Sequence, residues 1–63
     1  MMYVFKVTIK YKNGETCLHN VTATYDVEAR EKAVRHDQQL FKDAGYEPPK
    51  VDYCEITLLA KLD

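Results

Sequence analysis

Two ionisable side chains occupy positions where apolar residues are expected. His19 falls on the apolar face of a predicted strand, and Asp37 lies about 40° from Ala33 around a predicted helix, within its apolar arc. The chain turns from the strand into the helix at Tyr25–Asp26. His19 lies roughly 17–20 Å back along the strand from this turn, and Asp37 lies about as far along the helix, so the two side chains should meet. Such a pair can act as a general base or can simply satisfy its own polar groups. The chain has no serine to complete a nucleophilic constellation, so we expect a structural pair and no catalytic residues.

The two cysteines, Cys17 and Cys54, lie in apolar runs, where a free thiol behaves as a small hydrophobic group. No signal peptide and no apolar run of about 20 residues is recognisable. We therefore expect free thiols in a cytoplasmic protein. The chain lacks the close Cys and His pairs that zinc sites need and has no glycine-rich phosphate loop. The sequence thus predicts neither a metal nor a cofactor.

Side-chain alternation predicts a hairpin with strands over about 2–11 and 15–24. Apolar residues recur at odd positions in both runs, and Asn13-Gly14 lies between them. A two-residue turn would set apolar positions opposite polar ones. A three-residue loop ending in Gly14 instead pairs Phe5 with Val21, so the hydrophobic pattern selects that register.

An amphipathic helix is predicted over 27–44. Asp26 is a suitable N-cap, Gly45 suits the position after the last turn, and Pro48-Pro49 prevents continuation. The expected buried face consists of Ala29, Ala33, Leu40 and Ala44, with Val34 and Phe41 on its flank.

A third strand over 51–61 completes a single small α+β domain, residues 1–63, of ββαβ order. A right-handed crossover would place this strand beside the first, in a three-stranded antiparallel sheet of order 2-1-3 with one helix packed on one face. Strict alternation puts five apolar residues of this strand on the helix side: Cys54, Ile56, Leu58, Ala60 and Leu62.

The sheet face away from the helix is the first candidate contact surface, because one helix covers only one face. Its apolar residues would suit a protein partner or a second copy of the chain, and its lysines and tyrosine would suit single-stranded nucleic acid. Either outer strand could also pair across a dimer. A further candidate is an acidic patch of Asp43, Glu47, Asp52 and Glu55. The expected face residues are Val4, Lys6, Thr8, Lys10, Leu18, Tyr53, Leu59 and Lys61.

Nine Lys and Arg against ten Asp and Glu give a formal net charge of −1, whereas proteins that coat nucleic acid usually carry a basic excess. With no reactive constellation, the sequence predicts a non-catalytic protein-binding module that acts by surface contact, with a homodimer as one form of it. The first alternative is a weak nucleic-acid binder that uses the exposed sheet face. The second is a small enzyme that uses His19 and Asp37. In size and build the chain is similar to small accessory proteins of phages and other mobile elements, some of which inhibit host or defence proteins by surface contact, and this resemblance implies an accessory or inhibitor protein.

Overall fold

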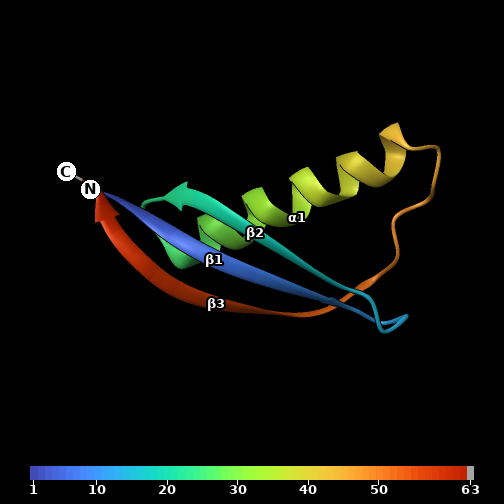
Figure 1. Cartoon of the computed structure of the whole chain (residues 1–63), viewed down its shortest axis with the longest axis horizontal. Helices are drawn as coiled ribbons and strands as arrows, with labels where there is room; N and C mark the ends of the chain where they lie inside the picture. Colours follow the sequence, from blue (N-terminus) through green and yellow to red (C-terminus); the bar gives the residue numbers. More distant parts are fainter. Residues whose placement is uncertain (63) are drawn as a thin grey trace.

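A computed structural model describes residues 1–62 of the chain. Its elements are β1 (Met2–Tyr11), β2 (Thr16–Ala23), α1 (Asp26–Asp43) and β3 (Val51–Leu62). The strands form one antiparallel sheet in the order β2-β1-β3, and α1 packs on one face of it (Figure 1). The predicted fold class is therefore confirmed. Across the described residues, no helix is long and apolar enough to cross a lipid bilayer.

The hairpin adopts the register that the hydrophobic pattern predicts. Phe5 pairs with Val21, and the loop places Gly14 at a φ of 92°, a left-handed conformation that other residues rarely adopt. The Gly14 N–H donates to the carbonyl of Tyr11 at 3.0 Å and closes the turn. β2 is one residue shorter at each end than the sequence indicates.

Helix α1 begins and ends one residue earlier than predicted, and it is terminated at Gly45 as the sequence indicates. Gly45 has a φ of 84° and the Tyr46 N–H donates to the carbonyl of Phe41 at 2.8 Å, which are features of a Schellman motif. At the other end, Tyr25 is the N-cap and makes no side-chain cap bond, so the assignment of Asp26 as the cap is wrong. Asp26 is the first helical residue, where its charge still favours the positive end of the helix dipole.

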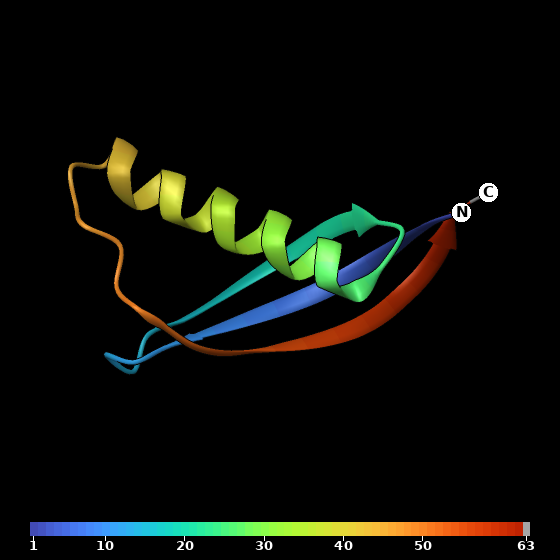
Figure 2. The same cartoon turned by 180° about the vertical axis from the view of Figure 1, so that it is seen from behind.

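The core lies between the central strand and the first half of α1. β1 supplies its large side chains, whereas α1 supplies Ala29 and Ala33, whose small size lets the helix approach the sheet closely. Towards its C-terminal end α1 diverges from the strands (Figures 1 and 2). Leu40 and Ala44 are therefore exposed, contrary to prediction, and Phe41 fills the widening space with its ring edge-on to Tyr11 at 5.9 Å.

Two register shifts interrupt the pairing of β3 with β1. Leu58 lies opposite Phe5 and Ala60 lies opposite Val4, so Leu59 is the extra residue of a β-bulge. A second shift near the start of β3 makes Asp52 the extra residue there. Each bulge inverts the faces of the residues beyond it.

The bulge at Leu59 corrects three assignments made by strict alternation. Ala60 and Leu62 pair with residues on the side away from the helix, so they do not belong to the core face. Lys61 lies opposite Tyr3 and therefore shares the helix side of the sheet, not the opposite face. Because side chains alternate between the two faces of a strand, one extra residue moves every later side chain to the opposite face.

Candidate functional site

A polar cluster is buried between α1 and the sheet. The Tyr11 hydroxyl donates to Oδ2 of Asp37, and Nε2 of His19 lies 2.7 Å from Oδ1 of the same carboxylate. His19 pairs with Val7 across β2 and β1, which sets its side chain on the helix side. The structure thus brings His19 and Asp37 together, and Tyr11 at the end of β1 adds a third member that the sequence analysis did not single out.

The cluster shifts the pKa values of its members. Burial alone would raise the pKa of Asp37, but the hydrogen bonds from Tyr11 and His19 outweigh burial and hold that pKa below its usual range. Burial, together with the bond to Asp37, raises the pKa of Tyr11. Burial and the nearby Asp37 charge also raise the pKa of the Cys17 thiol. At neutral pH the cluster therefore holds a carboxylate facing a neutral phenol and a neutral thiol.

The polar atoms of this cluster are engaged with one another. Both oxygens of Asp37 accept hydrogen bonds, and Nε2 of His19 is engaged with that carboxylate. Within residues 1–62, no buried polar side-chain atom lacks a hydrogen-bond partner. Through the carboxylate of Asp37, the cluster connects α1 to both β1 and β2. It lies where α1 begins to diverge from the sheet.

Neither cysteine forms a disulfide, because Cys17 and Cys54 lie opposite the same residue, Ile9, on the two sides of the central strand. Over the described part of the chain, no three His, Cys, Asp or Glu side chains converge as metal ligands.

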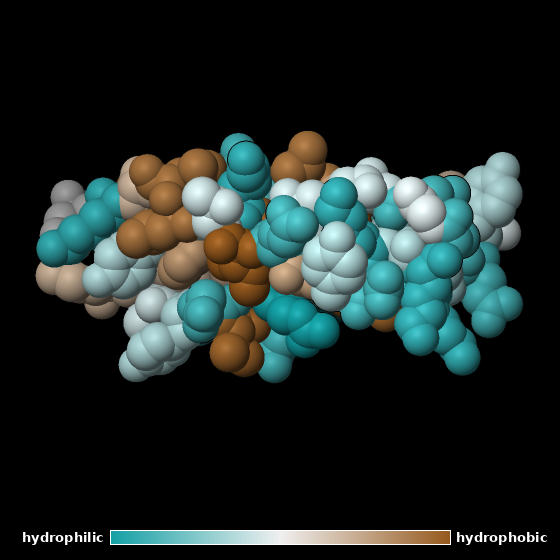
Figure 3. All heavy atoms as spheres, turned by 90° about the horizontal axis from the view of Figure 1, so that it is seen from below, coloured by the Kyte–Doolittle hydropathy of each residue, from teal (hydrophilic) through white to brown (hydrophobic). Residues whose placement is uncertain are grey.

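The sheet face away from α1, here termed the outer face, carries most of the predicted contact residues. Leu18 lies opposite Thr8 and is 62% exposed, and Tyr53 lies opposite Lys10 and is 49% exposed. Figure 3 views this side of the molecule from below, and its hydrophobic atoms gather mainly towards the end where the termini lie. By strand pairing, the outer face comprises Met2, Val4, Lys6, Thr8, Lys10, Thr16, Leu18, Asn20, Thr22, Tyr53, Glu55, Thr57, Ala60 and Leu62, and the alternation from Leu58 adds Leu59.

The four residues of the predicted acidic patch come from different elements of the fold. Asp43 ends α1, where its carboxylate accepts a hydrogen bond from Nε2 of Gln39 at 2.8 Å. Glu55 lies on the outer face, on the other side of the sheet. Glu47 belongs to the connecting loop and Asp52 to the first bulge of β3.

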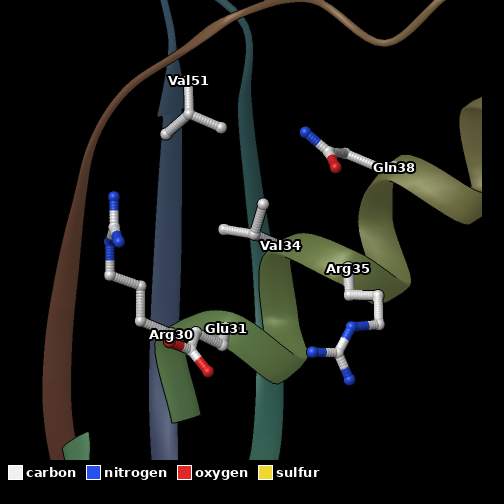
Figure 4. A pocket seen from close by; sticks show the side chains of 6 residues that line it. All are labelled: Arg30, Glu31, Val34, Arg35, Gln38 and Val51. Atoms are coloured by element: carbon white, nitrogen blue, oxygen red, sulfur yellow. The ribbon is translucent and has the colours of Figure 1, made fainter. Parts of the chain in front are cut away.

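Sequence reasoning missed an open hollow of about 400 Å³ between α1 and the start of β3. In Figure 4, Val34 and Val51 point towards each other, with Arg30 and Gln38 on either side. The bulge at Asp52 turns Val51 to this side, and alternation gives no sign of it. The hollow is lined by Arg30, Glu31, Val34, Arg35, Gln38 and Val51.

Comparison with protein-family models, with curated proteins and with solved structures yields no match.

Proposed function

We propose that the chain is a non-catalytic protein-binding module that acts by surface contact through the outer face. The observation that carries the proposal is an uncovered antiparallel face with large exposed apolar side chains. In the described chain α1 is the sole helix, and it lies on the opposite side of the sheet. Leu18 and Tyr53, on the two outer strands, project from this face.

The chemistry of the outer face suits a partner protein with a flat apolar patch. Covering a large apolar side chain that is half exposed or more contributes about 1–2 kcal/mol. Tyrosine adds a hydroxyl that can bond to the partner at the edge of a contact. Threonines and Lys6 surround these side chains and supply a polar rim. Occupying such a patch on a host protein would be enough to inhibit it.

The buried cluster supports the non-catalytic part of the proposal. Both oxygens of Asp37 accept hydrogen bonds, and the raised pKa values of Tyr11 and Cys17 disfavour the phenolate and thiolate that nucleophilic chemistry needs. The His–Asp pair accordingly serves the fold.

A second candidate, binding of single-stranded nucleic acid, is favoured by the direct opposition of Lys10 and Tyr53 on the outer face. It is weakened by Glu55 on the same face and by Lys61 on the other. Fluorescence anisotropy with single-stranded oligonucleotides at low salt separates the candidates. Salt-dependent binding that Lys10→Ala abolishes would favour nucleic acid, and we expect no binding.

The decisive test compares two equally exposed residues on opposite sides of the molecule. Leu18 on the outer face and Val27 on α1 are each 62% exposed. Proteins captured from the native host by the unmodified chain should be lost with Leu18→Glu and retained with Val27→Glu, as measured by quantitative mass spectrometry. The proposal would be contradicted if only Val27→Glu abolished capture of the host proteins, or if neither substitution changed the amount captured.

A further inference from the structure

β3 is an edge strand with apolar side chains exposed on both of its faces. On the helix side Leu58 is 57% exposed, because α1 lies chiefly over β2 and β1. On the outer face Tyr53 and Leu59 are each 49% exposed. Figure 2 shows β3 as the strand farthest from the helix along most of its length. This is the longest strand, with 12 residues, and its outer edge faces no other strand of the sheet.

The other edge of the sheet is partly protected. Nζ of Lys32 donates to the backbone carbonyl of Thr22 on β2 at 2.9 Å, and Glu28 holds the same ammonium at 3.2 Å. A lysine placed against an edge strand is a common way to prevent strand addition. The two edges therefore differ, and β3 is the one suited to pairing with another strand.

The sequence of β3 is self-complementary in one antiparallel register. A two-fold axis perpendicular to the sheet keeps both helices on one side and sets residues of the same face opposite each other. An axis at Glu55 would bring two carboxylates together, which destabilises strand pairing. An axis at Thr57 would set the carboxylate of Glu55 beside the apolar Leu59 of the second copy. An axis at Ile56 sets Glu55 opposite Thr57 and Leu59 beside Tyr53, so it avoids both problems.

We propose that β3 pairs antiparallel with β3 of a second copy about Ile56, to form a continuous six-stranded sheet. On the helix side, Ile56 then meets Ile56 of the second copy, and Leu58 meets Cys54 of the second copy. On the outer face, Tyr53 lies beside Leu59 of the second copy. These contacts cover apolar residues that one chain leaves exposed.

Charge complementarity supports a second copy as the occupant. Asp52 lies near one end of β3 and Lys61 near the other. The antiparallel register sets Lys61 opposite Val51 of the second copy, next to Asp52 of that copy. Because the pairing is symmetric, this contact occurs twice. The inference uses the edge of β3 and stands independently of the partner surface proposed above, although dimerisation would join the two outer faces.

Sedimentation velocity with matched variants tests the dimer. At about 100 µM, where weak specific complexes are populated, the unmodified chain should sediment as a dimer. Leu58→Lys should lower the association constant roughly tenfold or more, because it places a charge in the apolar row. Leu18→Lys, on the other edge strand, should leave the association constant unchanged. Circular dichroism verifies that each variant folds.

A monomeric unmodified chain at that concentration overturns the proposal. So does dissociation by Leu18→Lys with a persisting Leu58→Lys dimer, which would indicate face-to-face contact. Disulfide formation gives a second measurement that does not depend on Leu58→Lys folding. Mild oxidation of Leu58→Cys should give a covalent dimer through Cys54, and no such dimer should form when Cys54→Ala is added. Equal cross-linking in both chains would exclude the register.

Discussion

Asp37→Asn tests whether one carboxylate holds α1 to the sheet. The substitution keeps the size of the side chain and removes its charge. An amide offers one acceptor oxygen where the carboxylate offers two, and it presents an N–H₂ group to one of the donors. The Tyr11 hydroxyl can still donate to the amide oxygen, but Nε2 of His19 would then have to accept from the amide N–H₂ group, and both contacts would lose the charge of the carboxylate.

The expected loss is large for a chain of this size. Hydrogen bonds to charged groups contribute about 1.5–3 kcal/mol each, against about 0.5–1.5 kcal/mol for neutral ones, and the substitution weakens two of them in a buried site. We therefore expect Asp37→Asn to lower the free energy of unfolding by about 2–4 kcal/mol. At typical stability per residue, the 63-residue chain has roughly 3–9 kcal/mol in total. The melting temperature should fall by roughly 10–30 °C.

Urea and thermal denaturation followed by circular dichroism measure this loss. Asp43→Asn is the matched control, because Asp43 is exposed and bonded only locally to Gln39. The control should change the free energy of unfolding by less than about 0.5 kcal/mol. If Asp37→Asn changes it as little as the control does, the cluster does not hold the helix and the reasoning is refuted.

Three further predictions follow from the same geometry. Because the pKa of Asp37 is lowered in the folded state, its contribution to the free energy of unfolding is complete above the unfolded pKa of about 3.9 and is lost as the pH falls below that value. The urea midpoint should therefore decline less steeply between about pH 6 and pH 2 in Asp37→Asn than in the unmodified chain. The raised pKa of Cys17 predicts slow alkylation by iodoacetamide at neutral pH that Asp37→Asn accelerates, and equal rates would contradict the influence of the carboxylate. Gly45→Ala should cost about 1 kcal/mol in urea denaturation, because Gly45 has a positive φ although open space surrounds it; an unchanged midpoint would contradict the backbone origin of that cost.

Much of the fold could be predicted because local signals agree with one another. Asn13-Gly14 and the odd-position pattern fix a single hairpin register, and Gly45 with the prolines after it predicts the end of the helix to within one residue. His19 and Asp37 were recognisable because each breaks an otherwise apolar pattern. Their contact depends only on distances counted along regular elements.

The remaining features depend on tertiary structure that alternation does not encode. Nothing in the run Leu58-Leu59-Ala60 distinguishes a bulge from regular pairing, since all three residues are apolar. The assumption of regular alternation through Leu59 therefore assigned Lys61 to the wrong face. The exposure of Leu40 arises from the angle between α1 and the sheet, which packing determines after the helix has formed.

Site-specific photocross-linking tests the partner surface most directly. A photoreactive side chain is introduced at position 18 on the outer face or at position 27 on α1, and each chain is irradiated in extract of the native host. We predict a covalent adduct with a host protein from position 18 and none from position 27. Adducts from position 27 alone, or from neither position, would contradict a protein-binding outer face.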